Sequence, residues 1–121
     1  MMKKLPDSEL MVMQAIWKCE QPVLRVQIDE ILQEIHPIAP TTLLTLLTRS
    51  ETKGFIRIEK TDKAAKYYPL IAEETYLAQE SKNFIQKLFN GNMSAFATAL
   101  CDSGISKEDL LELKKILERS E

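Results

Sequence analysis

Threonine residues recur at helical spacing in the stretch APTTLLTLLTRSETKGFI, residues 39–56. Four of them fall at i, i+4, i+7 and i+11 and share one face of a predicted helix: Thr41, Thr45, Thr48 and Thr52. On the other side, Leu43, Leu46 and Leu47 are spaced to pack into a core. Threonine is a mediocre helix former, because its branched β-carbon loses rotamer freedom against the preceding turn. A merely solvated face would more usually carry Glu, Lys, Gln or Arg, so the threonine face needs another explanation.

The chemistry of these side chains suits the groove of a DNA duplex. Threonine offers a hydroxyl and a methyl group, and a groove is lined by phosphate oxygens, base-edge acceptors and thymine methyls. Leu44 lies off the core stripe, where it can meet a thymine methyl, and Arg49 is able to contact guanine or clamp a phosphate. The alternative interpretation is that the threonines are the solvated face of a structural helix.

Residue patterns that carry catalysis or hold a cofactor are missing from the sequence. It has no Gly-rich phosphate loop, no Ser/His/Asp grouping and no paired His/Glu motif, so we expect neither an enzyme nor a cofactor. The lone His36 has no ligand-type neighbour, and Cys19 and Cys101 form no CxxC-type pair, which argues against a metal site. We expect Cys19 to be a partly buried thiol and Cys101 to pack near an interface rather than to sense redox state.

The elements around the threonine stretch are mostly helical, with one interruption. Apolar spacing predicts helices over 7–19, 24–35, 40–53, about 72–89 and 106–121, with a short apolar segment at 93–101. Gly54 is placed to end the third helix in a left-handed conformation, and Ser106 to cap the last helix. Residues 55–70 alternate instead and predict a β-hairpin. Three helices and a hairpin predict a mainly α fold, a winged helix-turn-helix whose third helix enters the DNA major groove beside the hairpin, or wing.

Length and composition are those of one globular domain, or of one domain with an appended element. The chain has 121 residues, of which 45% are hydrophobic and 28% charged. Its net charge of −2 does not by itself indicate a nucleic-acid binder. The charge is uneven along the chain: residues 1–70 carry ten Lys or Arg against nine Asp or Glu, whereas residues 71–121 carry six against nine. No run approaches the length of a membrane span, so we expect a cytoplasmic protein with no membrane partner.

The predicted wing carries four cations opposed by two carboxylates. Charged hairpin tips are often only soluble turns, but beside a recognition helix we expect some of these cations to contact phosphates. The predicted DNA-contact set therefore joins the third helix and the wing: Thr41, Thr42, Leu44, Thr45, Thr48, Arg49, Arg57, Lys63 and Lys66.

Five segments, in order, make the chain similar to a known family: LPDSELMVMQAIW, PTTLLTLLTR, KGFI, YYPL and SKNFIQKLF. From about Leu5 to Leu117 the chain resembles the penicillinase-repressor family, the BlaI/MecI/CopY group of bacterial winged-helix repressors. The resemblance implies a homodimeric repressor that binds a palindromic operator of β-lactamase, methicillin-resistance or copper-transport genes. For the β-lactam branch it also implies a membrane sensor protease system that triggers cleavage in the C-terminal dimerisation region.

The chain departs from the family pattern at several positions. Similar repressors often carry basic residues in place of Thr41 and Leu44, so we expect weaker non-specific DNA binding and a shifted operator sequence. The C-terminal cysteine cluster of the copper branch is absent, which argues against copper sensing. The Asn–Phe bond cleaved in the β-lactam branch aligns, through KNFI and Gly91, with Ala99–Leu100, the implied cleavage site.

Residues 71–121 are predicted to form a helical dimerisation region that follows a DNA-binding domain at residues 1–70. The last helix has an apolar stripe that so small a chain is not expected to bury internally. The predicted dimer contacts are apolar: Phe84, Leu88, Phe96, Leu100, Leu110, Leu113 and Leu117. Two alternatives stay open, a winged-helix protein-interaction module without DNA binding and a ligand-responsive regulator that is not cleaved on induction.

Overall fold

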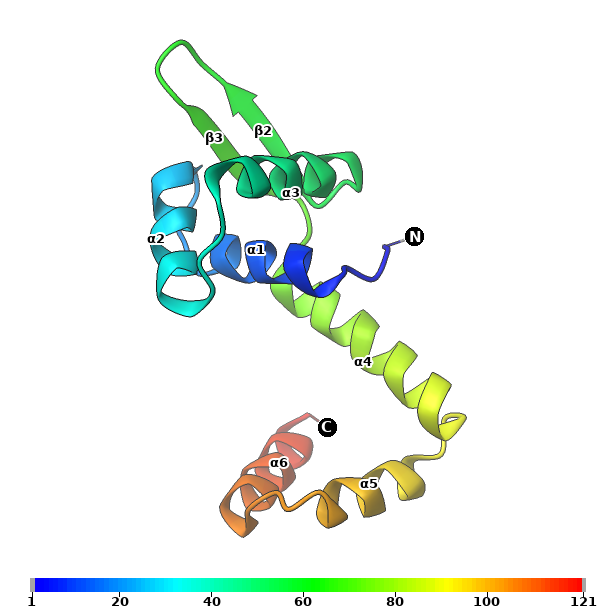
Figure 1. Ribbon diagram of the computed structural model, residues 1–121. Helices are drawn as coiled ribbons and strands as arrows, with labels where there is room; N and C mark the ends of the chain where they lie inside the picture. The colour runs from blue at the N-terminus through cyan, green and yellow to red at the C-terminus, as the bar shows by residue number, and fades with distance from the viewer. Residues whose placement is uncertain (1, 121) are drawn as a thin grey trace. The chain divides into compact units, whose positions relative to one another are not determined.

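The computed structural model describes residues 2–120 of the chain (Figure 1). Its elements run in the order α1 (Asp7–Trp17), β1 (Val23–Leu24), α2 (Arg25–Ile35), α3 (Pro40–Thr52), β2 (Ile56–Lys60), β3 (Ala65–Pro69), α4 (Glu73–Phe89), α5 (Met93–Asp102) and α6 (Lys107–Arg119). The fold is mainly α with one small antiparallel sheet, which confirms the predicted class. None of the helices within residues 2–120 is long and apolar enough to cross a membrane.

The chain divides into two compact units, Met1–Gln79 and Glu80–Glu121, hereafter the first and the second unit. The division falls within α4, so the first turns of this helix belong to the first unit. The first unit therefore extends nine residues past residue 70, where the sequence analysis placed the domain boundary.

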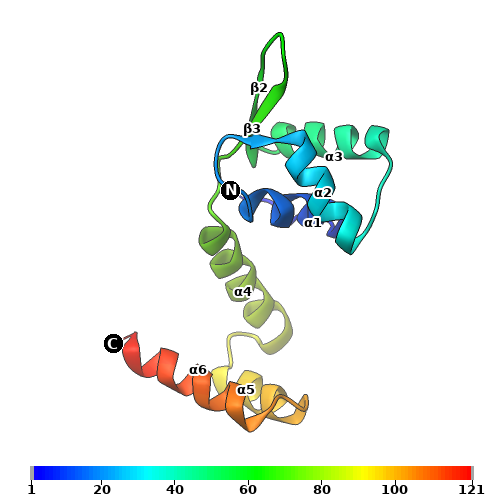
Figure 2. The same ribbon diagram turned by 90° about the vertical axis from the view of Figure 1, so that its left-hand side faces the viewer.

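The sheet of the first unit has the strand order β1-β3-β2. Strands β2 and β3 form the predicted hairpin, with Arg57 opposite Tyr68 and Glu59 opposite Lys66. Figures 1 and 2 show this wing extending beyond the helices of the first unit. Strand β1, which pairs Val23 with Tyr67, was not predicted, because two residues are too few to show an alternating pattern.

The hydrophobic core of the first unit is built from α1, α2, α3, the sheet and the start of α4. Tyr76 ties α4 to this core: its hydroxyl accepts a hydrogen bond from the Leu5 backbone N–H at 2.9 Å, and its ring lies 5.6 Å from Phe55 and 5.8 Å from Trp17. The Trp17 indole N–H donates to the Ile71 carbonyl at 2.9 Å. Residues 71–76 are therefore part of the folded unit.

An ion pair fixes the C-terminal end of α3 to α1. Lys53, the residue after α3, places its ammonium 2.6 Å from the carboxylate of Glu9, which is buried. Gly54 then leaves the helix with a φ of +82°, the left-handed conformation predicted for it. The ion pair to α1 and the turn at Gly54 together hold the C-terminal end of α3 in place against the core.

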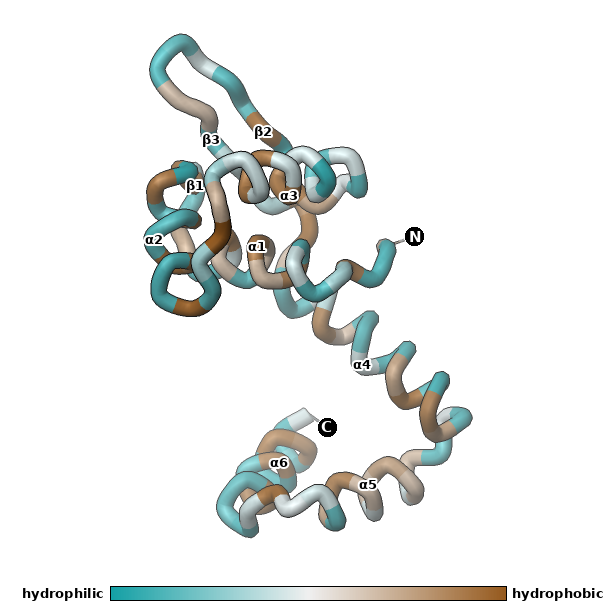
Figure 3. The backbone as a smooth tube through the Cα atoms, viewed as in Figure 1, coloured by the Kyte–Doolittle hydropathy of each residue, from teal (hydrophilic) through white to brown (hydrophobic). Residues whose placement is uncertain are grey.

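The second unit contains the end of α4, then α5 and α6. The apolar segment 93–101, which carried no predicted element, forms α5, capped by the Asn92 side chain, which accepts from the Ala95 backbone N–H at 3.0 Å. Ser106 caps α6 as predicted, accepting from the Asp109 backbone N–H at 3.1 Å. Figure 3 shows hydrophobic stretches along α5 and α6, yet no residue from Glu80 to Ser120 is buried.

Candidate nucleic-acid interface

Helix α3 presents two opposite faces. Leu43, Leu46 and Leu47 are buried as predicted, and the fourth buried residue, Ser50, donates its hydroxyl to the Leu46 carbonyl at 2.9 Å. All four threonines of the predicted stripe are exposed. Pro40 occupies the start of the helix, where its missing N–H costs nothing. The sequence therefore folds so that the threonine face points away from the core.

Three of the threonine hydroxyls donate to carbonyls of their own helix. Thr45 donates to Thr41 at 3.0 Å, Thr48 to Leu44 at 2.9 Å, and Thr52 to Thr48 at 3.0 Å. This arrangement is common for threonine inside a helix, and it occupies the hydroxyl hydrogen. The groups that remain for a partner are the methyl and the oxygen lone pairs.

The two ends of α3 hold polar groups of a different kind. Within residues 2–120 the hydroxyls of Thr41 and Thr42, in the first turn, take part in no hydrogen bond. The first turn of a helix also exposes backbone N–H groups that favour anions. Arg49 is exposed in the last turn and forms no side-chain hydrogen bond or ion pair within the described residues. These donors are available to phosphate or base acceptors.

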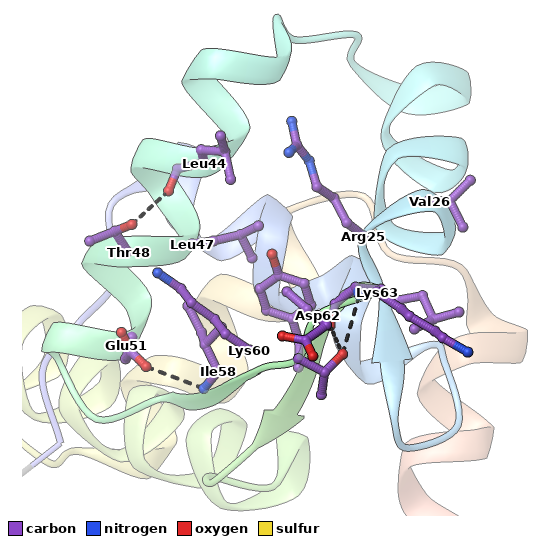
Figure 4. Close-up of a pocket in the computed structure, with 15 residues that line it drawn as sticks. Arg25, Val26, Leu44, Leu47, Thr48, Glu51, Ile58, Lys60, Asp62 and Lys63 are labelled. Carbon is purple, nitrogen blue, oxygen red and sulfur yellow. Dashed lines mark hydrogen bonds between the residues drawn. The ribbon is translucent and has the colours of Figure 1, made fainter.

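A groove of about 650 Å³ lies between α3, the start of α2 and the wing (Figure 4). Leu44, Leu47 and Ile58 supply part of its apolar lining. Its charged lining residues are three cations and two carboxylates: Arg25, Lys60, Lys63, Glu51 and Asp62. The excess of cations gives the groove a net positive charge, which favours a polyanion.

Side-chain hydrogen bonds hold the walls of this groove in place. The Glu51 carboxylate accepts from the Ile58 backbone N–H at 3.2 Å and joins α3 to β2, as Figure 4 shows. The Arg25 guanidinium donates to the Pro40 carbonyl at 3.2 Å and joins α2 to the start of α3. Burial raises the pKa of Tyr67, another lining residue; the charge of Arg25 lowers this pKa and that of Glu51 raises it.

The cationic side chains of the wing lie on two different faces of the hairpin. Side chains alternate along a strand, so Arg57 and Lys66 lie on the face opposite to Ile58 and Tyr67, which line the groove. Arg57 lies over the Tyr68 ring at 4.2 Å and pairs with Glu59 at 3.4 Å. Of the predicted contact residues, the groove lining includes Leu44, Thr48 and Lys63, whereas Arg57 and Lys66 are on the far face of the wing.

Some groove residues were absent from the predicted contact set. Lys60 was visible as a wing charge, and it lies two residues after Ile58 on β2, so it shares the groove face of the wing. Arg25 begins α2 and reaches the start of α3, and Glu51, near the end of α3, reaches β2. The sequence offered no signal for these two contacts, because each joins elements that are separate along the chain.

Three further residues have side chains capable of chemistry: His36, Cys19 and Cys101. His36 is exposed at the end of α2. Cys19 is partly buried as predicted, donates its thiol to the Ala15 carbonyl at 3.4 Å, and has its pKa raised by burial. Cys101 is exposed on α5. Within residues 2–120 no three His, Cys, Asp or Glu side chains gather to hold a metal ion.

Three helices, an exposed face on the third helix and a flanking hairpin make this a winged helix-turn-helix protein. Among solved structures it is similar to Bacillus licheniformis BlaI, in its monomeric form in complex with the blaP half-operator. That match has a TM-score of 0.52 and 29% identity, and covers 63% of this chain and 92% of the BlaI chain. The penicillinase repressor family model matches residues 5–119, and the chain belongs to that family.

Curated relatives agree with this assignment. The methicillin resistance regulatory protein MecI of Mammaliicoccus sciuri is 31% identical over 117 residues, which cover 96% of this chain and 94% of MecI. The penicillinase repressor of Bacillus licheniformis is 31% identical over 124 residues, with 97% and 94% covered. The predicted family is confirmed, and these relatives are regulators and repressors rather than enzymes.

Proposed function

We propose that this protein is a transcriptional repressor that binds double-stranded DNA through α3 and the wing. The observation that carries the proposal is the exposed face of α3 beside a groove of net positive charge. That face carries the threonines and Arg49, whose side chain pairs with no other residue within 2–120. Its structural neighbour BlaI was solved on a half-operator. A repressor of bacterial genes acts on chromosomal DNA, which places the protein in the cytoplasm.

The two ends of α3 have distinct tasks in this proposal. Thr41 and Thr42, with the backbone N–H groups of the first turn, hold a phosphate and set the depth of the helix in the major groove. Arg49 contacts a guanine or a phosphate. Lys60 and Lys63 approach the backbone from the groove side of the wing, and Arg25 does so from the start of α2.

The second unit is proposed to form a homodimer. Phe84, Leu88 and Leu117 are 50%, 58% and 60% exposed, and no residue of the described part of this unit is buried. Exposed apolar surface of this kind marks an interaction site. A palindromic operator requires two recognition helices about 34 Å apart, and a fixed dimer provides that spacing.

The apolar surface of the second unit is larger than the predicted dimer contacts. Phe96, Leu100 and Leu110 of that set are partly buried, and Leu113 is exposed. Met93, Leu111 and Ile116 are also exposed and were not predicted. Of these, Ile116 belongs to the predicted apolar stripe of the last helix, although it was left out of the predicted contact set. We include all three in the proposed interface because they lie on the same two helices, α5 and α6.

Release of the operator is proposed to follow cleavage at Ala99–Leu100, as in regulation of β-lactam-resistance-type genes by a sensor protease. This bond lies in the last turn of α5, where the Leu100 carbonyl accepts from both the backbone N–H and the hydroxyl of Ser103. A protease needs the segment extended, so this turn has to unwind first; helix ends are the parts that open most readily. Cleavage would remove α6 and weaken the dimer.

Salt-dependent titration of the full chain against a palindromic duplex tests the DNA-binding proposal. The expected result is binding that weakens linearly on a log–log plot as salt rises. Binding to no duplex at any salt concentration would favour the protein-interaction module. Mass spectrometry of the protein from induced cells tests the cleavage separately, since intact protein would favour the ligand-responsive regulator.

A further inference from the structure

The middle of the α3 face offers methyl groups rather than hydrogen-bond donors. The hydroxyl hydrogens of Thr45 and Thr48 are bound to the Thr41 and Leu44 carbonyls at 3.0 and 2.9 Å, and Figure 4 shows the second of these bonds. Donation to a base would break the intrahelical bond, so little free energy would be gained. The γ-methyl group of each threonine carries no such constraint.

Leu44 adds to this apolar surface. It lies four residues before Thr48 on the same helix, lines the same groove and is 44% exposed. A leucine in this position has no acceptor or donor to offer a base edge. Thr45 and Thr48 are about 4.5 Å apart along the helix axis at 1.5 Å per residue. This is close to the step of about 3.4 Å between bases of one strand.

The major groove of DNA contains one apolar group that these side chains fit. Thymine carries a C5-methyl there, whereas the other bases present hydrogen-bond donors and acceptors. Resting on the proposed function, we propose that Thr45, Thr48 and Leu44 set operator specificity by packing against thymine methyls. The hydrogen-bonding contacts then come from the ends of α3, at Thr41, Thr42 and Arg49. The half-site is expected to carry thymines beneath the centre of the helix.

Paired substitutions in protein and DNA separate methyl contact from hydroxyl contact. The DNA probe is a palindromic duplex selected by the full chain from a randomised pool, made once with thymine and once with deoxyuridine, which lacks only the methyl. Thr45→Ser and Thr48→Ser keep the hydroxyl and remove the methyl, while Thr45→Val and Thr48→Val keep the methyl and remove the hydroxyl. Thr52→Ser is the matched control, because Thr52 has the same intrahelical bond but lies about 10 Å from Thr45 along the axis.

The wild-type chain is expected to bind the deoxyuridine duplex more weakly, by about fourfold for each thymine methyl that the protein packs against. Each Ser variant should bind the thymine duplex more weakly by a similar factor and should discriminate less between the two duplexes. The Val variants should stay within about twofold of wild type, since the buried methyl is retained. Thr52→Ser should discriminate as wild type does.

Two results would overturn the inference alone. One is equal wild-type affinity for the two duplexes; the other is Val variants that bind more weakly than Ser variants, which would show that the threonine hydroxyls form hydrogen bonds with the DNA. Failure of the wild-type chain to enrich any duplex would instead overturn the proposed function together with this inference. Circular dichroism and thermal unfolding of each variant check that the helical content and the fold are retained.

Discussion

The two units differ in how many of their apolar side chains they bury. The first unit has a buried core that runs from Leu5 to Tyr76, and within residues 2–79 it leaves six large apolar side chains exposed: Leu24, Val26, Ile35, Leu44, Leu70 and Leu77. In the second unit large apolar side chains lie on the surface and none is buried among the described residues. A unit of about 40 residues rarely encloses a core by itself. The first unit therefore has a hydrophobic core of its own. The second unit is suited to burying its apolar side chains by packing against another protein surface.

Helix α4 shows this contrast within one element. Tyr76, in the first unit, is 3% exposed and touches two other aromatic rings. Phe84, in the second unit, is 50% exposed, and its one aromatic neighbour within the described residues is Phe89 at 6.2 Å. Both residues are aromatic and lie on the same amphipathic helix. Their different exposure therefore results from the other elements that pack against α4 in each unit.

Removing one phenylalanine from each unit is the strongest test of this contrast. Phe55→Ala should lower the free energy of unfolding of the first unit by about 3–5 kcal/mol, because it leaves a cavity in a closed core. Phe84→Ala should cost the isolated chain no more than about 1 kcal/mol, from removal of the ring pair, but should weaken self-association. Denaturant unfolding at low and high protein concentration measures both. An equally large, concentration-independent loss for Phe84→Ala would contradict the contrast.

Truncation tests where the self-sufficient unit ends. A chain ending at Gln79 should fold as a monomer and bind DNA more weakly than the full chain, because it loses the effective concentration of two linked sites. A chain ending at Leu70 lacks Tyr76 and should be less stable by roughly 3 kcal/mol for the buried ring. Loss of the Trp17–Ile71 hydrogen bond adds about 1 kcal/mol.

Sedimentation and thermal unfolding of the two truncated chains and the full chain provide the measurements. Full-length protein that sediments as a monomer at micromolar concentration would contradict the homodimer. Equal stability of the two truncated chains would show that residues 71–79 are not needed by the first unit.

Local sequence patterns predicted the elements but not the contacts between them. The spacing of Leu43, Leu46 and Leu47 was enough to identify the buried face of α3, and Gly54 marked its end, because both signals are local to the helix. The groove was not predictable in the same way. It depends on Arg25 reaching Pro40, on Glu51 reaching Ile58, and on the turn of the wing placing Lys63 against the groove.

The threonine stripe shows a further limit of the sequence. Its position on the helix surface was predicted correctly. The sequence did not show, however, that the hydroxyls of Thr45, Thr48 and Thr52 donate to carbonyls of their own helix. Whether a threonine hydroxyl bonds back to the helix depends on its rotamer, and residue type alone does not specify that rotamer.

Within the first unit, two cations near the C-terminal end of α3 should affect different properties: Arg49 operator affinity and Lys53 the stability of the fold. Arg49→Ala should reduce operator affinity by about 1–3 kcal/mol with little change in stability, because Arg49 is exposed. Lys53→Ala should instead destabilise the fold by about 1–3 kcal/mol, because it leaves the buried Glu9 carboxylate without its partner. Operator titration and denaturant unfolding of both variants separate the two roles. An unchanged titration for Arg49→Ala would remove Arg49 from the contact set.

The smallest expected effect distinguishes the two faces of the wing. Lys63 lines the groove beside α3, whereas Lys66 lies on the far face opposite Glu59. If the groove face meets the DNA backbone, Lys63→Ala should flatten the log–log salt dependence of binding by up to about 0.9, because one phosphate is no longer neutralised. Lys66→Ala should leave that slope unchanged, because its charge is on the face of the wing that is turned away from α3. Both variants are read in the same titration series, at several salt concentrations and on one duplex. A flatter slope for Lys66→Ala with none for Lys63→Ala would mean that the wing meets DNA through its outer face, where Arg57 also lies.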